Sequence, residues 1–74
     1  MSISEMSTKK SLTRREREVL FWVSRGKTAW ETSVILNISK TTVISHLKNS
    51  RDKLDTTNIA QTIAEAMKRS EIPS

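Results

Sequence analysis

The side chains that could do chemistry in this sequence are short hydroxyls and long cations, gathered in one stretch. A helical repeat over residues 40–54 would place on its outward face Lys40, Thr41, Ile44, Ser45, Lys48 and Arg51, beside Asp52. Cations neutralise phosphates, and hydroxyl and ammonium groups hydrogen-bond the edges of bases. Lys48, one turn after Ile44, is the best candidate for a base or phosphate contact. The pattern predicts a surface that binds double-stranded DNA.

Helix N-termini offer a second kind of phosphate contact, because their free N–H groups and dipole attract anions. Lys40, Thr41 and Thr42 stand at one predicted N-terminus, although the Thr42 hydroxyl is also a candidate for the helix cap. Lys27 and Thr28 stand at another. We expect both sets to touch the DNA backbone, the alternative being ordinary solvated side chains.

Catalytic groups are scarce. The chain has one histidine (His46), one glycine, and neither cysteine nor tyrosine. No phosphate loop, metal-ligand cluster or nucleophile–base pair can be assembled from this set. We therefore expect no enzyme, no metal site and no cofactor. We expect His46 to be partly buried, where it holds the turn or a phosphate.

The charge balance points to a polyanionic partner. Thirteen Lys and Arg against eight Asp and Glu give a net charge of +5 and a pI near 10.1. Such a balance is typical of nucleic-acid binding, whereas a lysine-rich surface that only confers solubility is the alternative. The longest apolar run covers residues 19–23, too short to span a membrane, and no signal peptide is recognisable. We expect a cytoplasmic protein.

Local signals divide the chain into four helices, expected over residues 14–24, 29–36, 40–54 and 59–69. Thr13 with Glu16 and Thr28 with Glu31 match the capping box, and Ser39 is a third N-cap. The break at 37–38 is tight, so the second and third helices form a helix-turn-helix. The sequence thus predicts an all-α domain over 12–70, preceded by a flexible arm or linker (1–11) and followed by a tail (71–74).

The helix over 59–69 has an apolar stripe of its own, although the first three helices already close a small core. We expect Ile59 and Ile63 to pack on the first helix. Thr62, Ala66 and Met67 would then face outward, where small residues allow a symmetry mate to approach. This pattern predicts a weak homodimer.

These features together resemble one family. From Leu12 to Met67 the sequence is similar to the LuxR-type helix-turn-helix domain of bacterial regulators. The matching residues are Leu12, Thr13, Arg15, Glu16, Glu18, Val19, Leu20, Gly26, Lys27, Thr28, Glu31, Ile38, Ser39, Thr42, Val43, His46, Leu47, Asn49, Lys53, Leu54 and Gln61. Trp22 and the stretches 26–28 and 53–58 look most like the autoinducer-responsive, quorum-sensing branch.

The resemblance implies a four-helix DNA-binding domain associated with the bacterial nucleoid. It implies a three-helix core whose third helix enters the major groove, and a fourth helix that forms the dimer face. RNA polymerase or a sensor domain would be a further partner. Trp30 and Val34 are candidates for such a contact, unless Trp30 only shields the junction between the first two helices.

Four positions depart from the family pattern. Thr32 replaces an Ile on the core face, where its hydroxyl is expected to bond the carbonyl four residues earlier. Asn37 and Asp55 replace turn glycines. Ile44 stands where many members carry Lys or Arg; it cannot bond a guanine edge, but it can pack on a thymine methyl.

Two functions remain open at this point. The first is a sequence-specific transcriptional regulator that acts as a dimer. The second is a truncated protein-interaction module that pairs with full-length regulators through its last helix and inhibits them. Ile44 on the expected DNA face keeps the second alternative open.

Overall fold

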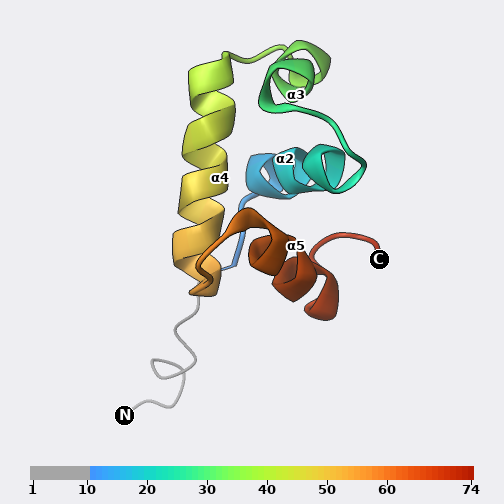
Figure 1. The fold of residues 1–74 in the computed structure, drawn as a ribbon, viewed down its shortest axis with the longest axis vertical. Helices are drawn as coiled ribbons and strands as arrows, with labels where there is room; N and C mark the ends of the chain where they lie inside the picture. The colour runs from blue at the N-terminus through green and yellow to red at the C-terminus, as the bar shows by residue number, and fades with distance from the viewer. Residues whose placement is uncertain (1–10) are drawn as a thin grey trace.

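A computed structural model describes residues 11–74, which form four helices and no strand (Figure 1). These are α2 (Arg14–Ser24), α3 (Ala29–Leu36), α4 (Lys40–Leu54) and α5 (Ile59–Lys68). The long helix α4 runs along one side, with α3 near its N-terminal end and α5 near its C-terminal end (Figure 1). The all-α prediction is confirmed. The first three helices have the expected bounds, and α5 ends one residue earlier than expected. The expected arm over 1–11 lies, apart from Ser11, outside the described residues.

Each of the four helices begins at an N-cap residue whose side chain accepts a backbone hydrogen bond. Both capping boxes are formed: the hydroxyl oxygens of Thr13 and Thr28 accept from the N–H groups of Glu16 (3.1 Å) and Glu31 (3.0 Å). The two Glu carboxylates accept from the N–H groups of the Thr residues, each at 2.9 Å. At the remaining two helices, the side chains of Ser39 and Asn58 accept N–H bonds from Thr42 (3.0 Å) and Gln61 (2.8 Å).

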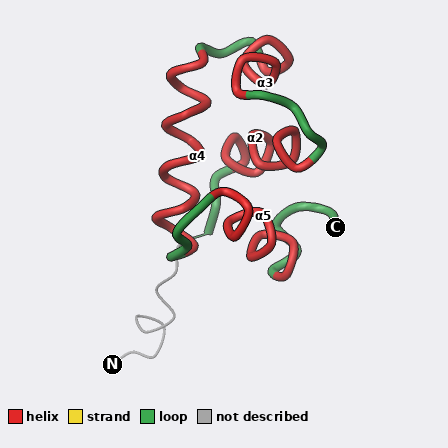
Figure 2. The backbone as a smooth tube through the Cα atoms, viewed as in Figure 1, coloured by secondary structure: helices red, strands yellow, loops and turns green. Residues whose placement is uncertain are grey.

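A left-handed residue follows every helix, and only one of the four is glycine. The positive φ angles are 90° at Gly26, 57° at Asn37, 57° at Asp55 and 60° at Ser70. After each, the next N–H bonds a carbonyl five residues back, as at Glu71 N to Ala66 O (2.8 Å). This pairing is the Schellman motif, which satisfies the last carbonyls and turns the chain sharply. The connections are therefore short (Figure 2).

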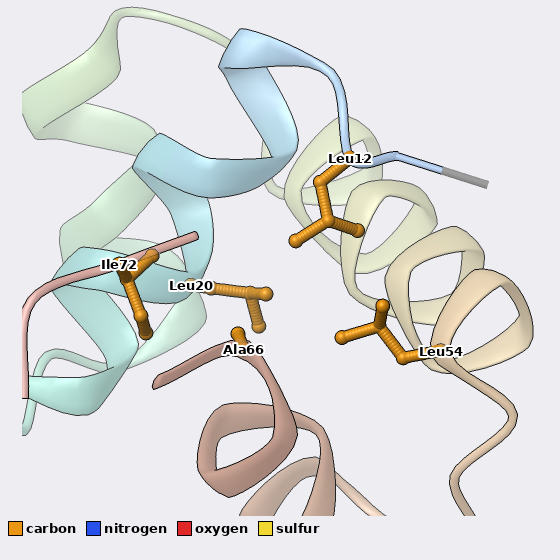
Figure 3. Close-up of a cluster of buried hydrophobic side chains, with 5 residues drawn as sticks. All are labelled: Leu12, Leu20, Leu54, Ala66 and Ile72. Atoms are coloured by element: carbon orange, nitrogen blue, oxygen red, sulfur yellow. The ribbon is translucent and has the colours of Figure 1, made fainter. Parts of the chain in front are cut away.

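The hydrophobic core gathers residues from α2, α4, α5 and the segments just before α2 and after α5. Leu12, Leu20, Leu54, Ala66 and Ile72 form one buried cluster (Figure 3). Val19 and Val43 are also fully buried. Leu12, which precedes α2, folds back on this core and is 3% exposed. Ile72, only 4% exposed, belongs to the residues expected as a tail, so this part of the tail packs with the helices.

The buried hydroxyls use the helix backbone, with one exception. Ser33, Ser50 and Thr62 donate to carbonyls three or four residues earlier, at 2.6–2.8 Å. Thr32 is also fully buried, but its hydroxyl has no hydrogen-bond partner. The expected bond from Thr32 to the preceding turn was therefore wrong. A buried hydroxyl without a partner is a standing cost to stability.

None of the described helices is long and apolar enough to cross a membrane.

Candidate nucleic-acid interface

The outward face of α4 carries the side chains that the sequence places against DNA. Lys40, Thr41, Ile44, Ser45 and Lys48 are all exposed. Helical geometry puts Thr41, Ser45 and Lys48 along the middle of this face, with Lys40 and Ile44 along one edge. Opposite them, Val43, Ser50 and Leu54 are buried and fix the rotation of the helix.

Two of the expected α4 contacts are less available than the others. Thr42 is half-buried, and its hydroxyl lies 2.8 Å from that of Ser39, while its N–H bonds the same oxygen. Thr42 therefore serves the helix cap, the alternative noted above. Arg51 is half-buried beside the Ile44 edge of the helix.

Lys48 is not an isolated cation. Its Nζ lies 3.3 Å from Oδ2 of Asp52, one turn later, and both side chains are largely exposed. Such a surface pair is weak and is screened by salt. Lys48 can therefore release Asp52 and bind a phosphate or a base instead. The Asp52 carboxylate would then lie unpaired on the same face, where it repels the DNA.

The N-termini of α3 and α4 differ in their electrostatics. At α3, the Glu31 carboxylate accepts from the Thr28 N–H, and this bond holds the pKa of Glu31 below its ordinary value. An anion already occupies that helix end. The first turn of α4 contains no acidic residue, so no carboxylate compensates its positive dipole end, and the cap is the neutral Ser39 hydroxyl. Of the two positions, α4 is better prepared to receive a phosphate.

At the other expected phosphate position, Lys27 and Thr28 are both exposed beside Glu31. The Thr28 hydroxyl and N–H are both used in the capping box. The structure thus leaves the exposed Lys27 ammonium group, rather than the Thr28 hydroxyl, to bind a phosphate at this end of α3.

His46, on the α4 side toward the core, is half-buried as expected. Its Nδ1 atom is buried and has no hydrogen-bond partner. Within the described residues, no cluster of three His, Cys, Asp or Glu could hold a metal ion.

The outward placement expected for the dimer residues was wrong for two of the three. Thr62 and Ala66 are both 0% exposed. The Thr62 hydroxyl lies 2.8 Å from the Asn58 carbonyl and 2.6 Å from the Thr56 hydroxyl, which makes its inward position possible. Met67 is half-buried and packs against the core cluster. The outward side of α5 is instead formed by other residues, with Ala60 and Ala64 exposed.

One positioning contact gave no signal in the sequence. Lys53 Nζ lies 2.8 Å from Oε1 of Glu16, with little exposure of either side chain. The sequence identified Glu16 only as a capping residue. Nothing in the local pattern pairs two residues 37 positions apart.

Two helices, α3 and α4, are joined by the tight turn at residues 37–39, and the second carries an exposed basic face. This arrangement defines the helix-turn-helix class of domain. The profile described as "Bacterial regulatory proteins, luxR family" matches residues 10–66. The chain belongs to this LuxR family of bacterial regulatory proteins, and it has the family's helix-turn-helix domain.

Individual proteins that resemble this chain support the same family assignment. The chain is 42% identical over 67 residues to the transcriptional activator protein LuxR of Aliivibrio fischeri, covering 90% of this chain and 27% of that protein. It is 50% identical over 56 residues to the quorum-sensing-dependent regulator RpaR of Rhodopseudomonas palustris, covering 76% and 23%. The chain thus spans about a quarter of the length of these relatives. The solved structure of the transcription factor GerE matches with a TM-score of 0.79 and 35% identity, over 84% of this chain and 94% of that one.

Proposed function

We propose that this chain binds double-stranded DNA sequence-specifically and regulates transcription, with α4 in the major groove. The observation that carries the proposal is the outward face of α4. It combines exposed short hydroxyls, exposed cations and a first turn without an acid. Helix-turn-helix proteins read base edges with the N-terminal part of this helix, while the preceding helix lies across the backbone. Lys27 and Lys40 would then bind phosphates, and Thr41, Ser45 and Lys48 would face the groove.

The relatives support this proposal, because LuxR and RpaR are named as transcriptional regulators. By the same comparison we infer that the chain is not an enzyme and that it works in the bacterial cytoplasm, on the nucleoid.

We further propose that the domain dimerises through α5, on a face different from the expected one. Ile59, Ala60, Ile63, Ala64 and Met67 follow one another around the helix as a continuous apolar edge. Ala60 and Ala64 are exposed, and the other three are half-buried. Small exposed residues one turn apart allow two copies of α5 to approach closely. One helix edge buries well under ~1,000 Å², so we expect a weak dimer that is completed on DNA.

A second surface supports a protein partner. Trp30 is 62% exposed and Val34 is 59% exposed, and they lie one turn apart on α3. This exposure does not fit a Trp30 that shields the junction between α2 and α3. We propose this pair as a contact for RNA polymerase or for a sensor domain.

The DNA proposal is tested by a gel-shift assay with genomic fragments and a salt titration. A domain that touches roughly three to five phosphates should give a log–log salt slope of about −3 to −4 per monomer. Lys48→Ala should weaken binding by about 1–3 kcal/mol, unequally across sequences, if Lys48 reads a base; an equal loss on all sequences would make it a phosphate contact. Lys68→Ala, with the same loss of charge on α5, is the matched control. Full affinity after replacement of both Lys40 and Lys48 would contradict the assignment of α4.

The runner-up function is an inhibitory module that pairs with full-length regulators through α5. The apolar edge of that helix favours it independently of any DNA contact. In the same assay, such a module would bind no fragment itself but would lower DNA binding by a full-length LuxR-type regulator.

A further inference from the structure

Ile44 is an apolar side chain in a polar surface. It is 50% exposed, and it is the one large hydrophobic residue that α4 exposes. The other exposed large hydrophobics of the described residues, Trp30, Val34 and Ile35, all lie on α3. Ile44 therefore needs an explanation separate from the apolar patch on α3.

The surroundings of Ile44 on the helix surface are cationic. Lys40 lies one turn before it and Lys48 one turn after it, while Arg51 follows two turns along the same edge. Thr41 lies between them on the middle of the face. An isoleucine set among three cations is poorly suited to an apolar protein partner, because the partner would have to cover the charges as well. It is well suited to a polyanion that also presents a small apolar group.

DNA presents one such group in the major groove. The edges of A, G and C offer hydrogen-bond donors and acceptors, whereas thymine adds a C5-methyl group. Ile44 cannot donate or accept a hydrogen bond, so a methyl is the feature that it can recognise. Burial of its exposed surface against that methyl is favourable, and a base without a methyl leaves part of that surface wet.

We propose that Ile44 makes this domain select thymine at one position of each half-site, by packing on the C5-methyl group. The proposal rests on the DNA-binding function proposed above. At this position Ile44 would prefer thymine, whereas a lysine or arginine would prefer guanine.

Deoxyuridine is the direct test, because it pairs as thymine does and lacks only the methyl. Duplexes are first selected from a random library with the full chain, and each thymine of the selected site is then replaced in turn. We expect one position per half-site at which deoxyuridine lowers affinity about fourfold, the factor equivalent to ~0.8 kcal/mol for one buried methyl-sized group. A duplex with cytosine at that position also lacks the methyl group and should bind more weakly. Replacing this cytosine by 5-methylcytosine should restore part of the lost affinity.

The protein side of the test uses Ile44→Ala. This variant should bind the thymine and deoxyuridine duplexes equally, whereas Ser45→Ala, the neighbouring control, should keep the difference. Because Ile44 is exposed, both variants should melt like the parent. Ile44→Arg should raise affinity for any duplex and move the preference at that position to guanine.

The outcomes separate the two proposals. If a site is selected but no thymine responds to deoxyuridine, or if Ile44→Ala keeps the response, the methyl contact is wrong and DNA binding stands. If no sequence is enriched from the library, the proposed function is overturned and the inference falls with it.

Discussion

Lys53 Nζ and Thr13 N–H both donate to the same oxygen, Oε1 of Glu16, at 2.8 and 2.9 Å. One carboxylate therefore caps the start of α2 and holds the C-terminal end of α4 against it. Helix α4 is the proposed recognition helix, and this contact fixes the end that lies away from the turn. Glu16 is buried, so the pair is shielded from solvent in a way that the surface pairs of Arg14 and Arg15 with Glu18 are not.

Acid should destabilise the domain through Glu16. Burial raises the pKa of this carboxyl, but the hydrogen bond and charge of Lys53 and the bonds to Thr13 outweigh it, so the pKa lies below its ordinary value of 4.5. A lowered pKa means that the stabilisation is complete above pH 4.5 and is lost as the pH falls through the folded-state value. We expect Glu16→Gln to lose about 1–3 kcal/mol at pH 7 and to melt with less pH dependence in acid.

Thermal melts at pH 7 and pH 3 measure this effect. Glu18→Gln is the control, because its ion pairs are exposed and should contribute little. Equal pH dependence in the parent and in Glu16→Gln would show that other carboxyls carry the acid transition.

Thr32→Val should stabilise the fold. The hydroxyl of Thr32 is buried and has no hydrogen-bond partner, so an isosteric methyl removes a polar cost without changing the volume. We expect a gain of about 1 kcal/mol, which raises the melting temperature by about 4–8 °C in a domain of this size. Ser50→Ala, which removes a hydroxyl that does have a partner, should give no such gain. A lower melting temperature for Thr32→Val would mean that the hydroxyl is satisfied in solution.

Asp55→Gly should also stabilise the fold, for a backbone reason. Asp55 has φ 57° and ends α4, where its charge also faces the negative end of the helix dipole. We expect a gain of about 0.5–1 kcal/mol in chemical denaturation. Asp55→Asn should give a smaller gain in stability, because it removes only the unfavourable charge. Asp55→Ala should lower the stability. A gain for alanine would contradict the left-handed conformation.

Asp52→Asn should strengthen binding to any DNA. The change removes a carboxylate from the proposed DNA face and releases Lys48 from its partner 3.3 Å away. Exposed pairs are worth about 0.2–1 kcal/mol, so we expect the affinity to rise about 1.4- to fivefold in a binding assay at constant salt concentration. Glu65→Gln removes the acid of an i, i+4 pair on α5, away from the proposed DNA face, and should give no gain. An unchanged affinity for Asp52→Asn would place Asp52 away from the DNA.

Ala64→Glu should break the proposed dimer while leaving the monomer intact. Ala64 is exposed on the apolar edge of α5, so a carboxylate there can meet its symmetry mate without entering the core. We expect affinity for a two-half-site duplex to fall on the order of tenfold or more, with half-site affinity and melting temperature unchanged. Met67→Glu should lower the melting temperature as well, because Met67 packs on the core. Sedimentation that shows a tight dimer without DNA would mean a larger interface than this edge.

Features that depend on nearby residues could be predicted from the sequence, whereas features that depend on residues far apart in the chain could not. The helix bounds could be predicted because each cap lies within a few residues of the helix end that it stabilises. The orientation of α5 could not, because its apolar residues cover a wide arc and the burial of Thr62 depends on a hydroxyl partner at Thr56. Ile72 follows α5 without any periodic pattern, so its place in the core was not visible either. On α4, one unbroken stripe of buried residues set the face, and the exposure of Lys40, Ile44 and Lys48 followed from it.

The left-handed helix endings also bear on how the chain reaches this structure. All four turns are closed by hydrogen bonds between residues no more than five apart, so they can form before any distant segment has arrived. Contacts of short sequence separation make folding fast, whereas Glu16 and Lys53 must close a long loop and meet late. We expect a domain that folds within milliseconds and rarely populates partly assembled forms. The apolar edge of α5 would then spend little time beside unfolded neighbours, which protects a newly made chain from aggregation.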